Sequence, residues 1–209
     1  MKKCIVIYTE GETDEEFYDS VLSTIRNKLP DKKFKVDILK KNCITGIAKF
    51  QKKLVNKFIK EISNIYYKDY EIIVFLCYDT DVFEFGVHPP VDRKKLENDL
   101  KNAGATKVIH IKAQKSIEDF FMYDLDGIVN FLKIKKPQNL RGTTGLEKLE
   151  KLFSKANRIY QKGHRCSGFI SSLDMNIIFP NICKEIKPLC VELGLNENCS
   201  SCKKDVSKK

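Results

Sequence analysis

Acidic residues gather at three points in the first half of the chain, and each point follows an apolar stretch of strand length. The carboxylates at these points belong to Glu10, Asp14, Asp79, Asp81 and Glu118. Parallel strands bring their carboxyl ends to one edge of a sheet, where ligands bind, so we expect these side chains to lie close together. Carboxylates at one point repel each other unless a cation compensates, and oxygen ligands suit Mg²⁺ or Mn²⁺. The sequence therefore predicts a site for Mg²⁺ or Mn²⁺, with one ion or two.

The spacing within each acidic cluster supports a shared site. Asp14 follows Glu10 by four residues, at the start of an expected helix, so both could point to the same spot, and Gly11 leaves room for a phosphate or a metal-bound water. Asp79 and Asp81 lie two apart in an extended segment and project to the same side. Taken singly, these residues have ordinary explanations as helix-dipole and turn residues. Their joint occurrence after two strands favours the site.

Strand and helix patterns alternate through the segment that carries these residues. Alternation of this kind predicts an α/β fold with a mainly parallel, four-stranded, Rossmann-like sheet flanked by helices. Thr13 and Ser116 stand where side-chain caps would begin two of the helices, and Thr13 with Glu16 fits a capping box. The expected strands cover 3–9, 34–39, 71–78 and 107–112, and further helices are expected over 47–67 and 92–103.

No strand pattern follows the fourth apolar stretch. Helical patterns continue instead, interrupted by a polar, basic connector at 133–144. We therefore expect a catalytic α/β domain over 1–125 and a basic, all-helical C-terminal extension over 126–209. The extension's expected helices are 126–132, 145–160, 167–179 and 182–193.

Charge is divided unevenly between the two parts. Residues 133–209 carry 16 Lys and Arg against 7 Asp and Glu, a net of +9, whereas residues 1–132 carry 22 against 21, a net of +1. A basic extension on a neutral body favours an anionic partner, most plausibly nucleic acid. A general excess of lysine on the surface is the alternative explanation. Within the extension, Lys162, His164 and Arg165 form a local basic cluster that is a candidate for phosphate contact, against the alternative of solvated loop side chains.

The first two acidic motifs resemble those of the TOPRIM domain, which topoisomerases, bacterial primases and small or defence-related nucleases share. The resemblance rests on Glu10-Gly11-x-x-Asp14 and Asp79-x-Asp81, each following a strand. The segment around the first motif, TEGETDEEFY, is most similar to the RloB-like and OLD-like nuclease branch. In that branch a third acidic motif, often with a nearby serine, follows the fourth strand, and Ser116-x-Glu118 matches it loosely. The resemblance covers residues 1–125.

The resemblance implies a magnesium-dependent nuclease of prokaryotic or phage-defence type that hydrolyses phosphodiester bonds of RNA or DNA. Related nucleases often act with an ATPase encoded nearby, and this chain has no Walker-type motif of its own, so an ATPase subunit is a candidate partner, and the sequence leaves open whether one is required. The implied metal ligands are Glu10 (also a candidate general acid or base), Asp14, Asp79, Asp81 and, for a second ion, Glu118. Lys115, next to the third motif, is a candidate catalytic cation, with an ordinary surface lysine as the alternative.

Two other functions remain open from the sequence. One is a non-catalytic, TOPRIM-like subunit that binds nucleic acid or docks a partner. The other is a different α/β phosphoryl-transfer fold, such as a receiver or phosphatase-like domain, which also places Asp at strand ends. The Glu10-Gly11 pair after the first strand favours the nuclease over the receiver.

The cysteines and the hydropathy bear on location and on a second metal. Four cysteines in the extension, Cys183, Cys190, Cys199 and Cys202, could bind structural zinc, but the first spacing suits helix packing better. Zinc is therefore not expected there.

No apolar run approaches the roughly 20 residues that a membrane helix needs, and the first residues do not form a signal peptide. We expect a cytoplasmic protein without a membrane partner.

Overall fold

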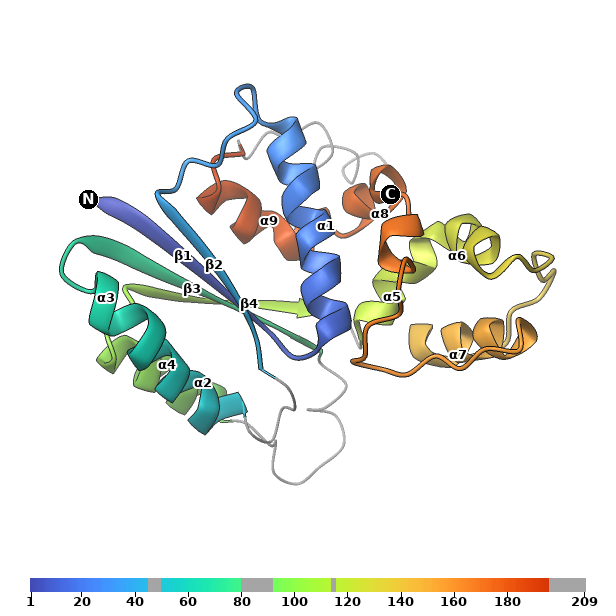
Figure 1. The fold of residues 1–209 in the computed structure, drawn as a ribbon, viewed down its shortest axis with the longest axis horizontal. Coiled ribbons are helices and arrows are strands. Elements are labelled where there is room, and N and C mark those ends of the chain that lie inside the picture. Colours follow the sequence, from blue (N-terminus) through green and yellow to red (C-terminus); the bar gives the residue numbers. More distant parts are fainter. Residues whose placement is uncertain (45–49, 80–91, 114–115, 196–209) are drawn as a thin grey trace, which may run out of the picture.

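The computed structural model describes residues 1–44, 50–79, 92–113 and 116–195. Its centre is a four-stranded sheet with the strand order β2-β1-β3-β4, and every neighbouring pair is parallel (Figure 1). This confirms the predicted α/β fold with a parallel sheet flanked by helices. The strands are β1 (Lys2–Thr9), β2 (Ile38–Cys43), β3 (Tyr70–Asp79) and β4 (Lys107–Ala113).

The two central strands are the most apolar segments of the chain, because helices cover both faces of the sheet. Cys4 of β1 pairs with Ile72 of β3, and the pairing continues residue by residue up to Tyr8 and Leu76. The next residues along the two strands therefore emerge side by side at the carboxyl edge. This register brings the segment after β1 next to Asp79, the last residue of β3.

One face of the sheet is covered by the helices that follow β2 and β3. Leu54, Phe58, Ile62, Leu96 and Leu100 are fully or almost fully buried against it. The helix expected over 47–67 is interrupted by a π-helical turn, and residues 45–49 lie outside the described part. The elements on this face are α2 (Phe50–Phe58), the π-helical turn η2 (Ile59–Ser63), α3 (Asn64–Tyr66) and α4 (Arg93–Asn102).

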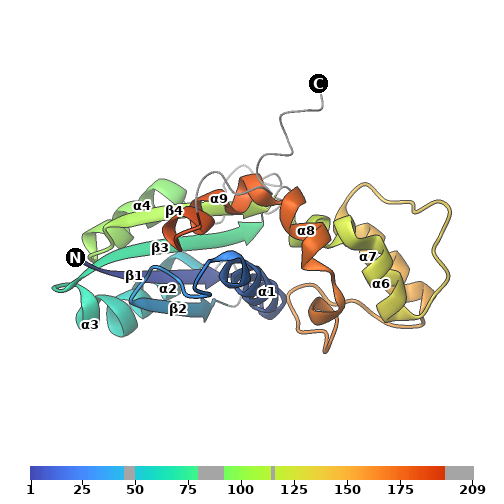
Figure 2. The ribbon, with the colours of Figure 1, turned by 90° about the horizontal axis from the view of Figure 1, so that it is seen from above.

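The other face carries α1 (Glu12–Lys28) and α9 (Cys183–Glu192), and the remaining helices extend the molecule beyond the carboxyl ends of the strands (Figures 1 and 2). One cluster of buried apolar side chains joins this face of the sheet to all of these helices. The region after β4 is therefore packed onto the same hydrophobic core as the sheet. The remaining elements are α5 (Ile117–Phe121), η4 (Met122–Asp124), α6 (Leu125–Leu132), α7 (Gly145–Lys155), η5 (Ile170–Ser172) and α8 (Met175–Asn181).

Three further predicted elements differ from the structure. The helix expected over 167–179 is divided into η5 and α8, because Leu173 between them is extended, with φ of −80° and ψ of 139°. The second strand begins at Ile38 rather than at residue 34, and Asp37 just before it exchanges hydrogen bonds with Lys3. The helix expected to run from 145 to 160 ends at Lys155 because Asn157, with φ of 53°, adopts the left-handed conformation that ends helices. Among the helices of the described part, none combines the length and the hydropathy that a bilayer-spanning segment requires.

Candidate functional site

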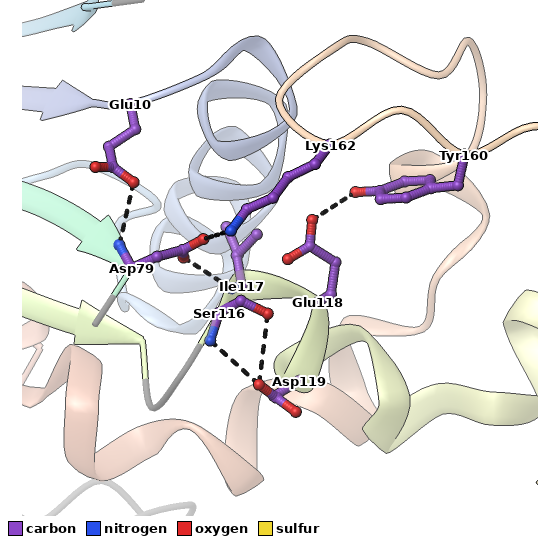
Figure 3. Close-up of polar contacts among 8 residues, drawn as sticks. All are labelled: Glu10, Asp79, Ser116, Ile117, Glu118, Asp119, Tyr160 and Lys162. Atoms are coloured by element: carbon purple, nitrogen blue, oxygen red, sulfur yellow. Dashed lines mark hydrogen bonds and ion pairs between the residues drawn. The ribbon is translucent and has the colours of Figure 1, made fainter. Parts of the chain in front are cut away.

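The carboxyl edge of the sheet brings together the first two predicted acidic motifs. Glu10 follows β1 directly, and Asp79 closes the neighbouring strand β3. The backbone N–H of Asp79 donates a hydrogen bond to Glu10 Oε2 at 3.3 Å (Figure 3). The parallel register of two buried strands thus places both residues at one point, as their positions in the sequence predicted.

Asp14 lies in the first turn of α1 and is only 7% exposed. Burial raises the pKa of its carboxyl well above the ordinary value, and the charges of Asp79, Glu10 and Glu118 raise it further. Asp14 is therefore within electrostatic reach of all three carboxylates. Four of the five predicted metal-ligand residues share one region of the fold, while Asp81 lies outside the described residues.

Asp79 is the central carboxylate of this region, and its side chain is 3% exposed. Its Oδ1 accepts a hydrogen bond of 2.9 Å from the backbone N–H of Ile117, the first residue of α5. Its Oδ2 forms an ion pair of 2.9 Å with Nζ of Lys162, whose side chain is 36% exposed. Asp79 thus connects the end of β3 to α5 and to the segment after α7 (Figure 3).

Glu118 is fully buried and faces the segment after α7 from α5. The hydroxyl of Tyr160 donates to its Oε1 at 2.9 Å, whereas its Oε2 has no hydrogen-bond partner among the described residues. Burial, followed by the charge of Glu118, raises the pKa of Tyr160 above the ordinary value of a phenol. A buried carboxylate oxygen without a partner is costly, so this oxygen is a position at which a cation would stabilise the fold.

Asp119 joins the start of α5 to the start of α7. Asp119 accepts hydrogen bonds from the backbone N–H of Ser116 at 3.1 Å and from the hydroxyl of Ser116 at 3.4 Å. Its other oxygen accepts from the N–H of Gly145 at 2.7 Å, the first residue of α7. Both oxygens of Asp119 are therefore engaged at helix starts, one at α5 and one at α7. The prediction that Ser116 begins a helix is confirmed.

The segment 160–165, here called the 160–165 loop, contacts the start of α1 through its backbone. Gly163 C=O accepts from the N–H of Glu12 at 3.1 Å, and His164 C=O accepts from the hydroxyl of Thr13 at 2.7 Å. The prediction that Thr13 caps α1 with Glu16 was wrong. The helix α1 begins at Glu12, so Thr13 lies inside it, and the Thr13 hydroxyl donates to the 160–165 loop instead.

Gly11 lets the two backbones approach each other. A Cβ atom at this position would lie 2.9 Å from the Cα of Gly163 and 3.0 Å from Oδ2 of Asp14. Any side chain here would push the 160–165 loop away from the acidic residues. The close contact explains why a glycine stands here, while the phosphate contact predicted for Gly11 stays a prediction.

The basic residues of the predicted phosphate site differ in what they contact. Lys162 reaches Asp79, as described above. His164 and Arg165 are exposed and contact α1 through their backbones, Arg165 N–H donating to Glu12 Oε2 at 3.3 Å. Lys115 lies outside the described residues. Tyr160 was not predicted as a site residue, because it fell at the end of the helix expected over 145–160. Asn157, a residue type that adopts the left-handed conformation readily, was the available signal for an earlier end of that helix.

The donor set suits a hard cation, although the described residues do not form a complete metal centre. Four carboxylates are the ligands that Mg²⁺ and Mn²⁺ prefer, and Glu118 Oε2 lacks a partner within the described part. No group of three His, Cys, Asp or Glu side chains in the described ranges is arranged to hold an ion. For zinc, Cys183 and Cys190 are buried on α9, and Cys199 and Cys202 lie outside the described residues.

Comparisons of the chain with protein-family models, with curated proteins and with solved structures found no match.

Proposed function

We propose that this protein is a magnesium- or manganese-dependent nuclease that hydrolyses phosphodiester bonds of RNA or DNA. The observation that carries the proposal is the meeting of Glu10, Asp14, Asp79 and Glu118 at the carboxyl edge of the sheet, with Lys162 beside them. Burial, and then the charges of Asp79, Glu10 and Glu118, raise the pKa of Asp14, and strongly perturbed carboxyls of this kind gather at sites where chemistry or a cation uses them.

In this proposal the four carboxylates hold the cation or cations. A divalent ion held there would supply a Lewis acid for a phosphoryl oxygen and for the attacking water. Glu10 follows β1 at the rim of the cluster and would bind an ion or take up the proton of the attacking water. Hydrolysis then forms a bond from the water oxygen to phosphorus and breaks the bond from phosphorus to the leaving ester oxygen.

The charge of the second part supports a polyanionic substrate. Residues 133–209 carry 16 Lys and Arg against 7 Asp and Glu. The exposed residues His164 and Arg165 stand on the same loop as Lys162, which reaches Asp79. Contacts from such side chains to phosphates would position a strand without selecting its bases. RNA and DNA are both substrates of the proposed class.

The narrower assignment to the TOPRIM class, with a role in phage defence and a partner ATPase, is also a proposal. It is supported by a parallel sheet whose first and third strands are neighbours, with Glu10 directly after the first and Asp79 at the end of the third. It rests otherwise on the resemblance of the acidic motifs.

One observation favours a second candidate, a subunit that binds nucleic acid without cleaving it. Lys162 already neutralises part of the charge of Asp79, and no three-ligand group is formed within the described residues. In this alternative the acidic cluster is a structural network, and the basic second part binds the nucleic acid.

Cleavage assays separate the two candidates. Labelled tRNA, single-stranded DNA and duplex DNA are incubated with the full chain and Mg²⁺ or Mn²⁺, and in parallel with a chelator. We expect metal-dependent cleavage of at least one substrate, reduced about 100-fold or more in Glu10→Gln and in Asp79→Asn. Glu150→Gln, an exposed change on α7, is the control and should cleave as the wild type does. Binding without cleavage of any substrate would support the second candidate.

A further inference from the structure

Lys162 places its ammonium group where a divalent cation would otherwise neutralise Asp79. Its Nζ lies 2.9 Å from Oδ2 of a carboxylate whose side chain is 3% exposed. In Figure 3 the carboxylates of Asp79 and Glu118 lie on either side of the end of the Lys162 side chain. The region that the proposed function assigns to a metal is thus already occupied by a positive charge of the chain itself.

The 160–165 loop is anchored on both sides of Lys162. Before Lys162, the hydroxyl of Tyr160 is hydrogen-bonded to Glu118. After it, the carbonyls of Gly163 and His164 accept hydrogen bonds from α1. The loop therefore keeps Lys162 within reach of Asp79.

We propose that Lys162 competes with the divalent cation for Asp79, so that the ion pair and cation binding exclude each other. A cation that takes Oδ2 of Asp79 as a ligand, at about 2.1 Å, would bring its charge to within about 5 Å of the ammonium, and like charges at that separation in a buried site repel. Lys162 would have to leave before the ion binds. This inference deepens the proposed function and rests on it.

The competition has a measurable consequence that differs from that of a phosphate-binding lysine. If only a fraction of the molecules has Lys162 away from Asp79, the apparent association constant for the cation is the intrinsic constant multiplied by that fraction. Removing the ammonium should therefore strengthen metal binding. A lysine that only contacts substrate phosphate would leave metal binding unchanged.

The test is calorimetric titration of the full chain with Mn²⁺ in the absence of nucleic acid. We expect Lys162→Met to bind Mn²⁺ about 5- to 10-fold more tightly than the wild type, because the competing state is lost. Lys162→Arg, which keeps the charge, should bind no more tightly than the wild type. Arg165→Met removes one charge from the same loop without touching Asp79 and should change the affinity less than about twofold.

The apparent melting temperature gives a second reading. With a chelator present, Lys162→Met should melt below the wild type, because Asp79 loses its partner while remaining buried. Adding Mn²⁺ should then raise its melting temperature by more than it raises that of the wild type. Lys162→Gln should behave as Lys162→Met does, which guards against a folding defect of one variant.

The outcomes separate the inference from the proposed function. Equal or weaker Mn²⁺ binding by Lys162→Met, or an equal gain in Arg165→Met, would overturn the competition while leaving Glu10-dependent cleavage as evidence for the nuclease. Absence of Mn²⁺ binding in the wild type and in every variant would overturn both.

Discussion

At the scale of single residues, the unusual feature of this protein is a set of carboxylates that lie close enough for their charges to interact, with Asp14 buried among them. Asp14 is the clearest case, because burial and then the charges of Asp79, Glu10 and Glu118 raise its pKa. A group with this environment gives up its charge or requires a cation. The same physical fact underlies both the proposed metal site and the pH dependence of stability.

The raised pKa of Asp14 predicts how stability changes with pH. The folded protein keeps a proton on Asp14 that the unfolded chain releases above pH ~4, so this group lowers the free energy of unfolding as pH rises, by at most ~1.4 kcal/mol per pH unit. Asp14→Asn lacks this dependence. In urea titrations with a chelator, its unfolding free energy minus that of the wild type should therefore grow between pH 4.5 and 7. A difference that stays flat or shrinks would contradict the raised pKa.

A matched control separates this effect from general changes in charge. Glu150→Gln removes an exposed carboxylate on α7. Its difference from the wild type should stay constant over the same pH range, to within ~0.5 kcal/mol.

At the scale of elements, the site depends on contacts between α5, α1 and the 160–165 loop. Tyr160 links the loop to α5 through the buried hydrogen bond to Glu118. Lys162 links the same loop to the end of β3. The geometry of the acidic residues is therefore set by a segment that follows the sheet by more than forty residues in the sequence.

Removing the Tyr160 hydroxyl tests this link. Tyr160→Phe leaves Oε1 of Glu118 without its buried donor, and we expect a loss of ~1–3 kcal/mol in the free energy of unfolding, measured by urea titration. Tyr67→Phe, at a side chain exposed on the far end of the sheet's other face, should change it by less than ~0.5 kcal/mol. Equal effects of the two variants would show that the link does not stabilise the fold.

The elements also show what sequence patterns can and cannot predict. Apolar runs located β1, β3 and β4 to within one residue of their bounds, and their alternation with helices predicted the parallel sheet. The meeting of Glu10 and Asp79 was expected on the condition that the first and third strands are neighbours, and the strand order β2-β1-β3-β4 fulfils it. The loop contacts did not, because Thr13 and His164 are 151 residues apart and a backbone carbonyl leaves no trace in residue types.

At the scale of the whole molecule, the helices after β4 complete the site by packing onto the core that covers one face of the sheet. Their shared core positions the 160–165 loop over the carboxyl edge (Figures 1 and 3). The division into domains at residue 125, and the nucleic-acid partner suggested by the basic second part, stay predictions.

The most direct test of the account is a crystal structure of the full chain soaked with Mn²⁺, with anomalous scattering used to locate the ion. The account predicts an anomalous peak about 2.0–2.3 Å from carboxylate oxygens of Asp79 and of Glu10 or Glu118, with Lys162 turned away. An acidic cluster that shows no peak at saturating Mn²⁺, with the Lys162–Asp79 pair intact, would contradict it.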